Sequence, residues 1–184
     1  MAVLTDPELI SGVKMISGGE KELQGVTANG GASFWNNEPI IPVTGLPEEA
    51  NEIIAADRFT GGGCTTTVDG IVNCWGAVVN AQVEGAVLDR YLLDTGIGHA
   101  CTVNDAGMVC WGLNNNGQLG IGNQEDSESA LPVRNIQSVV DLATGLHHTC
   151  AIIDDEIIKC WGENLYGQLG DGSLSNSTMP VFVK

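Results

Sequence analysis

The sequence predicts an all-β protein built as an array of four similar units. Two observations lead to this prediction: a long motif occurs twice in one register, and tryptophan recurs at comparable spacing. The fuller copy of the motif begins at residue 148 as HTCAIIDDEIIKCWG, followed by Asn164 and by GQLG at residues 167–170. The other copy begins at residue 99 as HACTVNDAGMVCWG, followed by Asn114 and by GQLG. Self-similarity of this kind decides an architecture ahead of any single residue.

Tryptophan marks the same phase in each predicted unit. The four tryptophans are separated by 40, 36 and 50 residues, spacings typical of propeller blades and solenoid repeats. We therefore expect one repeat domain over residues 1–184. The units take about residues 7–41, 42–83, 84–131 and 132–178, a spare closing strand takes residues 179–184, and the tryptophans are Trp35, Trp75, Trp111 and Trp161.

Each unit is predicted to hold four short antiparallel strands. In the fourth unit, Pro132-Val133 opens a first strand, and residues 139–145 form a second strand that ends in glycine. A hairpin of two further strands follows at residues 148–162. A sheet of four short strands that buries its faces only against its neighbours is a propeller blade, so the predicted fold is a β-propeller-like array of four four-stranded blades.

The first and third units follow the same order. The first has a strand at residues 13–19 and a hairpin at residues 24–35, and the third has a strand at residues 91–96 and a hairpin at residues 101–110. The segment at residues 121–130 is polar and acidic without periodicity. We expect it to be a surface loop.

The second unit carries two conflicting signals. Residues 47–52 have the proline and acidic residues of a helix start. Alignment on the cysteines, however, places Ile53-Ile54 at Val139-Val140 of the fourth unit. We therefore expect a strand over residues 53–57 and assign no element to residues 47–52.

The charge of the chain argues against two classes of partner. Its 23 acidic and 7 basic side chains give a formal net charge of −16 at pH 7. Such a charge repels both a nucleic-acid backbone and an anionic membrane surface. The first thirty residues do not show the basic and apolar regions of a signal peptide, and no apolar run reaches the length of a bilayer span. Neither nucleic acid nor membrane is an expected partner.

The six cysteines fall in pairs that flank the three later hairpins. With turns of two or three residues, the members of a pair lie directly opposite each other, where non-hydrogen-bonded positions bring Cβ atoms to about 4.5–5.5 Å. We predict disulfides, and an extracellular or particle-surface location; six buried free thiols, and a cytoplasmic location, are the alternative. The predicted disulfides are Cys64–Cys74, Cys101–Cys110 and Cys150–Cys160.

The remaining repeated residues are expected to be structural. The tryptophans are interpreted as packing wedges between blades, with a ligand-stacking platform as the alternative. His99 and His148 share one repeat position and are expected to be structural histidines. Catalytic residues, a cofactor site and a metal site are not predicted. Turns between blades are assigned to residues that tolerate positive φ or cap the chain, namely Asn114, Gly117, Gly120, Asn164, Gly167 and Gly170.

Residues 145–172 resemble the repeat of the regulator of chromosome condensation family. That repeat reads glycine, two spacers, His-Thr-Cys-Ala, a turn, Cys-Trp-Gly, asparagine and Gly-Gln-Leu-Gly. Residues 96–122 resemble it nearly as well, and residues 64–75 resemble it in part. The resemblance implies a β-propeller of roughly seven blades. Four units and one strand would instead close as a small propeller or form an open arc that a partner completes.

These observations predict a non-enzymatic structural or protein-interaction module, self-assembled or bound to a protein partner. An edge strand at Pro180, Val181, Phe182 and Val183 is expected to template a partner strand. One alternative function is a structural subunit of a virion or an extracellular surface assembly. The other is implied by the family resemblance, whose best-known activity is guanine-nucleotide exchange on a small GTPase.

Overall fold

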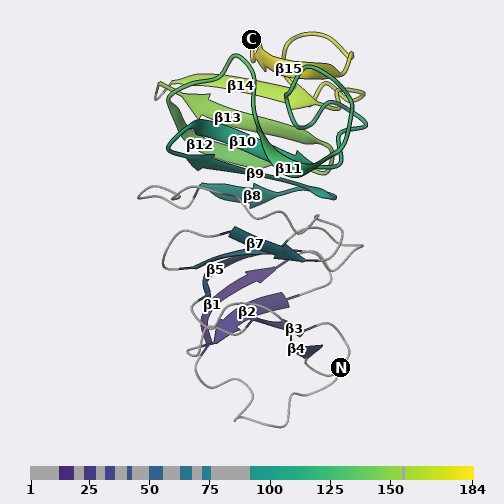
Figure 1. The fold of residues 1–184 in the computed structure, drawn as a ribbon. Helices are drawn as coiled ribbons and strands as arrows, with labels where there is room; N and C mark the ends of the chain where they lie inside the picture. The colour runs from purple at the N-terminus through teal and green to yellow at the C-terminus, as the bar shows by residue number, and fades with distance from the viewer. Residues whose placement is uncertain are drawn as a thin grey trace.

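The fold is known from a computed structural model, which describes residues 92–154 and 156–184 throughout. Before residue 92 it describes the strands, with the side chains of Cys64, Val72 and Cys74. The fifteen described strands form four antiparallel sheets, and Figure 1 shows them following one another in chain order. This architecture confirms the all-β prediction.

The four sheets are made of strands that are consecutive in the sequence. The first contains β1 (Val13–Gly18), β2 (Leu23–Thr27), β3 (Ala32–Trp35) and β4 (Ile41–Pro42), and the second contains β5 (Ala50–Ala55), β6 (Gly63–Thr67) and β7 (Val72–Trp75). The third contains β8 (Leu93–Thr95), β9 (His99–Asn104), β10 (Gly107–Gly112) and β11 (Ser127–Pro132). The fourth contains β12 (Val139–Thr144), β13 (His148–Ile153), β14 (Ile157–Gly162) and β15 (Ser177–Phe182).

The third and fourth sheets, whose side chains are described, are the four-stranded units that the repeat predicts. The second sheet has three described strands. An array of four complete blades, closed or open, stays a prediction. Within the described part of the chain, no helix is long and apolar enough to cross a membrane.

The outer strand of each of these two sheets corrects the predicted unit boundaries. β11 pairs with β10 through Cys110 and Leu131, so the strand ending at Pro132 completes the third sheet and does not open the fourth. β15 likewise pairs with β14, through Cys160 and Val181. Residues 179–182 are therefore not a spare strand, although β15 is an edge strand of its sheet. Repeat spacing alone does not say which neighbouring hairpin an outer strand joins, which is why the predicted phase was off by one strand.

The second sheet corrects the alignment predicted for Ile53 and Ile54. Ile54 lies opposite Cys64, and Ala143 lies opposite Cys150, so Ile54 holds the position of Ala143 and not that of Val140. Ten positions separate Ile54 from Cys64 and seven separate Ala143 from Cys150, because the connecting segment of the second unit is longer. β5 also begins at Ala50, within the segment of helical propensity, since pairing in a sheet outweighs local preference.

A break in register recurs at the same place in three sheets. It lies between Val139 and Asp141 in β12, between Ala50 and Glu52 in β5, and between Val13 and Met15 in β1. A β-bulge increases the local twist of a strand and is a retained feature of sheets that use it. The first unit, the least regular in sequence, thus keeps the backbone pattern of the fourth.

Apolar side chains gather between successive sheets. Strand side chains point alternately to the two faces, so an inner sheet contributes to the core on both sides. The cluster between the second and third sheets contains Cys64, Val72, Cys74, Leu93, Ala100, Val109 and Trp111. The cluster between the third and fourth sheets contains Cys101, Met108, Cys110, Leu119, Ile121, Val133, Ile136, Ala151, Ile153 and Trp161.

Candidate interaction surface

The contact between the third and fourth sheets shows which side chains a repeat uses to pack against its neighbour. The third sheet contributes the Cys101–Cys110 disulfide and Met108, all of them buried. The fourth sheet contributes Ala151, and Trp161 with no exposed surface. Burying a side chain of this kind stabilises the contact by roughly 1.5–3 kcal/mol relative to leaving the side chain exposed. A copy of this face without a neighbouring sheet would therefore gain free energy by binding a partner.

Buried hydrogen bonds fix how the third and fourth sheets are aligned with each other. The backbone oxygen of Gln118, in the loop after β10, accepts bonds from Trp161 Nε1 at 2.9 Å and from Thr149 Oγ1 at 3.0 Å. Because the Thr149 hydroxyl donates its one proton there, it accepts from His99 Nε2 at 3.1 Å. Burial lowers the pKa of His99 to about 4, so the ring is neutral at pH 7. His99 is a structural donor.

The loop that carries Gln118 is held by the asparagine of the repeat. Asn114 Oδ1 accepts from the backbone nitrogen of Leu119 at 2.9 Å, and its Nδ2 donates to the carbonyls of Asn123 and Glu125. Asn164 Oδ1 accepts from the Leu169 nitrogen at the same distance. Each asparagine therefore holds its Gly-Gln-Leu-Gly loop by the same hydrogen bond, which its side-chain oxygen accepts from the backbone nitrogen of the leucine.

These loops correct one assignment made from the sequence. The loop with Asn114, Gly117 and Gly120 joins β10 to β11 of one sheet, so it is not a turn between blades. It nevertheless packs on the next sheet. Gly120 has φ +68°, and a Cβ atom there would lie 2.7 Å from Trp161 Nε1, so the tryptophan requires glycine at this position. Asn164, Gly167 and Gly170 likewise lie between β14 and β15 of the fourth sheet.

The disulfides are those that the repeat phase predicts. Cys64 is joined to Cys74, Cys101 to Cys110 and Cys150 to Cys160, with Cα–Cα distances of 4.1, 4.1 and 4.0 Å. These distances fit directly opposed residues of a non-hydrogen-bonded pair. Two of the predicted tryptophans, Trp111 and Trp161, are fully buried in the two clusters, whereas the side chains of Trp35 and Trp75 lie outside the described part of the structure.

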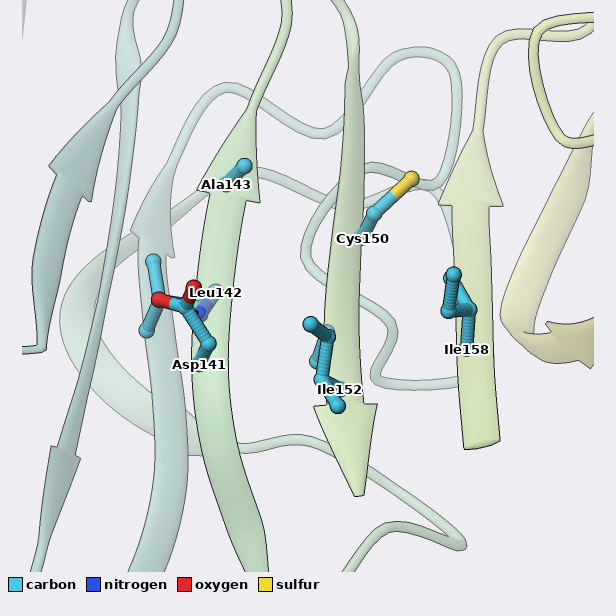
Figure 2. Close-up of a pocket in the computed structure, with 7 residues that line it drawn as sticks. Asp141, Leu142, Ala143, Cys150, Ile152 and Ile158 are labelled. Atoms are coloured by element: carbon cyan, nitrogen blue, oxygen red, sulfur yellow. The ribbon is translucent and has the colours of Figure 1, made fainter. Parts of the chain in front are cut away.

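The opposite side of the fourth sheet leaves part of its apolar surface uncovered. Cys150, Ile152 and Ile158 lie on this side, and Figure 2 shows them on the adjacent strands β13 and β14. Ile158 is 44% exposed. Together with residues of β12 they line a hollow of about 80 Å³. We call this side of β12–β15, which carries Cys150, Ile152 and Ile158, the open face. The residues that line the hollow are Asp141, Leu142, Ala143, Cys150, Ala151, Ile152 and Ile158, of which Leu142 and Ala151 also belong to the packing against the third sheet.

The open face repeats, position for position, the face that the third sheet buries. Cys150 corresponds to Cys101, and Ile158, opposite Ile152, corresponds to Met108, opposite Val103. Sequence reasoning missed Ile152 and Ile158 as site residues. The available signal was their position in the repeat, because each is two residues from a cysteine of the hairpin.

The histidines near the open face do not form a metal site with their neighbours. Burial lowers the pKa of His148, and Glu163 acts in the opposite direction. Among the described residues, no three His, Cys, Asp or Glu side chains are arranged to hold a metal ion. Asp171 accepts bonds from the nitrogen and hydroxyl of Ser173, which lower the pKa of its carboxyl; its visible role is to shape a turn.

Comparison with known proteins agrees with this repeat. Residues 108–152 match one model of the regulator of chromosome condensation (RCC1) repeat, and residues 139–168 match a second. No curated protein sequence matches the chain significantly.

Several solved structures share the fold. Yeast RCC1 (Prp20) bound to Kap60 has a TM-score of 0.74 at 15% sequence identity, over 94% of this chain and 48% of that chain. Human WBSCR16 has a TM-score of 0.67 at 16% identity, over 94% and 53%. The ectodomain of the Arabidopsis thaliana receptor kinase ACR4 has a TM-score of 0.56 at 18% identity, over 94% and 52%.

The chain therefore spans about half the length of these structures. Identities below 20% speak for the fold alone, and the match to the repeat family is confined to residues 108–168. Residues 108–168 match the RCC1 repeat, and the chain has the fold of part of an RCC1 propeller.

Proposed function

We propose that this chain is a non-enzymatic RCC1-repeat module that acts by binding protein through its open face. The observation that carries the proposal is the pair of matching faces. The third sheet buries its Met108 face against a neighbouring sheet, and the fourth leaves the equivalent Ile158 face open. A clustered apolar face of this kind on a soluble protein is typical of an interaction site.

The chemistry of the open face favours a protein over other ligands. Its hollow of about 80 Å³ is small against the few hundred cubic ångströms of a typical small-molecule site. Its apolar side chains offer no phosphate-binding group, and the net charge of −16 opposes nucleic acid and anionic lipid. An apolar sheet surface is best covered by another apolar surface of similar extent.

The structural relatives give independent support. Yeast Prp20 is bound to Kap60 in one solved structure, and it also binds Gsp1p and histones. Those partners belong to Prp20 and are not transferred to this chain. They support the view that a propeller of this fold works by contacts with other macromolecules.

The test is position-specific photo-crosslinking in an extract of the native source. A photoreactive phenylalanine replaces Ile158 on the open face, and in a control it replaces Ile157, which is 41% exposed on the other side of the same strand. We expect a discrete protein adduct from position 158 that excess unlabelled chain competes away, with little adduct from position 157. Equal labelling at both positions, or adducts to nucleic acid, would overturn the proposal.

A further inference from the structure

We propose that the loop between β14 and β15 is a second binding surface, which takes a protein segment whose apolar side chains are flanked by lysine or arginine. The proposal does not rest on the open face. It comes from three apolar side chains that stand on this loop and from the acidic side chains around them. We call the three residues the apolar patch; they are Leu165, Tyr166 and Leu174.

The apolar patch is exposed and occupies one short stretch of surface. Leu165, Tyr166 and Leu174 are 61%, 88% and 66% exposed. Leu165 and Tyr166 are consecutive, and the Leu174 side chain lies beside Gly167, where a Cβ atom would be 3.7 Å from it. Single exposed apolar residues are ordinary on a protein surface. A group of them on one loop is typical of an interaction site.

The third repeat shows that this exposure does not depend on whether another sheet follows. Its corresponding loop joins β10 to β11 and has Asn115, Asn116 and Gln124 at the three positions. Asn115 and Gln124 are exposed, although the fourth sheet packs on the third. A further sheet would therefore leave Leu165 and Leu174 exposed. Packing between repeats uses polar residues here, so the apolar patch is a separate property of the fourth repeat.

The loop holds the apolar patch in a fixed position before a partner binds. The backbone nitrogen of Tyr166 donates to Gln168 Oε1 at 2.9 Å. Asn164 Oδ1 accepts from the nitrogen of Leu169, whose side chain is fully buried. An aromatic side chain on an ordered loop loses little conformational entropy on binding. We therefore expect Tyr166 to anchor the contact.

The charges around the apolar patch indicate what the partner carries. The β14–β15 loop adjoins the β10–β11 loop: both leave the same end of their sheets (Figure 1), and Asn176 Nδ2 donates to Asn116 Oδ1 at 3.1 Å. Neither loop contains lysine or arginine. Their acidic residues are Glu125, Asp126, Glu163 and Asp171. A protein segment with basic residues beside its apolar ones complements this surface, whereas nucleic acid and an anionic membrane are repelled by it.

The ring of Tyr166 also suits a basic residue directly. An aromatic ring attracts an ammonium or guanidinium group over its face. The fourth sheet already contains such a contact, in which Lys159 Nζ lies 4.7 Å from the centre of the Phe182 ring. We therefore expect the partner to place a lysine or arginine on Tyr166 and apolar side chains on Leu165 and Leu174.

Selection of short random peptides displayed on phage, with the purified 184-residue chain as the target, tests the chemistry of the partner. We expect the enriched peptides to combine apolar residues with lysine or arginine. Their binding should weaken as salt is added, because exposed charges are screened. Enrichment of acidic peptides, or of apolar peptides without basic residues, would overturn the inference.

Exchange of residues between the two loops locates the contact. The combined variant Leu165→Asn, Tyr166→Asn and Leu174→Gln gives the fourth repeat the residues with which the third repeat already forms this loop. We expect it to weaken binding of a selected peptide at least about tenfold. Ile157→Asn is the control, because Ile157 is 41% exposed at the opposite end of β14; it should leave the affinity unchanged. Circular dichroism of both variants checks that the fold is retained.

The acidic residues are tested by the reverse exchange, Glu125→Ser with Asp126→Asn. The fold tolerates asparagine at this position, because Asn176 accepts from the Asn164 nitrogen as Asp126 accepts from the Asn114 nitrogen. We expect a several-fold loss of affinity at low salt that disappears at high salt.

Two results would assign the binding elsewhere. An unchanged affinity in either exchange variant would overturn the inference; if Ile158→Asp abolishes binding instead, the peptide occupies the open face and the proposed function stands. Flotation with phosphatidylserine vesicles tests a membrane as the alternative partner. We expect the chain to remain unbound, and vesicle binding that the apolar-patch variant loses would overturn the inference in favour of a lipid surface.

Discussion

Met108 and Ile158 occupy the same register position in successive sheets, two residues before the second cysteine of each hairpin. Met108 is 2% exposed and Ile158 is 44% exposed. The two side chains are both apolar, and the fourth sheet covers Met108, whereas no described sheet covers Ile158 on the corresponding side. The comparison shows what a following sheet contributes to a repeat, namely the burial of this apolar position.

Aspartate substitutions at these two positions should have very different costs. Met108→Asp buries a carboxylate in the cluster between the third and fourth sheets, and we expect it to lower the free energy of unfolding by more than about 3 kcal/mol. Ile158→Asp should lower it by less than about 1 kcal/mol. Urea denaturation measures both losses, at protein concentrations low enough that the chain does not associate. Similar losses at both positions would show that the open face is covered within the single chain.

The hydroxyl of Thr149 should contribute measurably to the contact between the two sheets. Thr149→Val keeps the shape of the side chain but removes its bonds to the Gln118 oxygen and from His99 Nε2. The Gln118 oxygen keeps its bond from Trp161 Nε1, but the buried His99 Nε2 loses its partner, which should cost roughly 1–3 kcal/mol. Thr95→Val is the matched control, because the Thr95 hydroxyl is buried without a partner among the described residues. Denaturant unfolding of both variants should show a clear loss only for Thr149→Val; equal effects would contradict this role.

The disulfides should differ in their accessibility to a reductant. Cys101 and Cys110 are fully buried between two sheets, whereas Cys150 is partly exposed on the open face. Thiol–disulfide exchange requires access to a sulfur atom, so Cys150–Cys160 should be reduced first under native conditions. Alkylation of the monomeric chain at successive times after the reductant is added, followed by mass spectrometry, gives the order in which the disulfides are reduced. Each bridge closes a short hairpin loop, and its removal should cost roughly 2–3 kcal/mol. Simultaneous reduction of all three disulfides would contradict the burial difference.

The sequence predicted the hairpins well because their two arms are close in the chain. The cysteines of each pair are separated by 9 or 10 positions, and a single turn fixes which of them face each other. The outer strands were placed in the wrong sheet because β11 and β15 are joined to their hairpins by long loops. A repeat of four strands has the same period wherever its start is set, so spacing alone left this choice open.

The open face was hidden from sequence reasoning for a related reason. An apolar residue at a repeat position predicts burial, and Ile158 carries the same signal as Met108. Whether a following sheet covers the position depends on its place in the stack, which only the structure shows. The alignment of Ile53 failed for another reason. It was made on the cysteines alone, which cannot reveal that the second unit has a longer loop between its first strand and Cys64.

The stability of the fold should fall as the pH falls from 7 to 5, with His99 as the main cause. Its pKa is about 4 in the folded protein and about 6.5 in an unfolded chain. Between these values the unfolded state binds more protons than the folded state, so the stabilisation is complete above pH 6.5 and is lost as the pH falls towards 4. From pH 7 to pH 5 the loss should be about 2 kcal/mol.

Two other groups modify this dependence. Burial also lowers the pKa of His148, which adds a contribution of the same sign. Burial raises the pKa of Asp94, against the hydrogen bonds from Thr144 and Thr95. A raised carboxyl pKa stabilises the fold as the pH falls, but mainly nearer pH 4. His99→Gln keeps a side-chain N–H donor and removes the titration, so urea unfolding of this variant should show a clearly smaller difference between pH 7 and pH 5 than the parent. An unchanged pH dependence would show that His99 does not titrate as its burial requires.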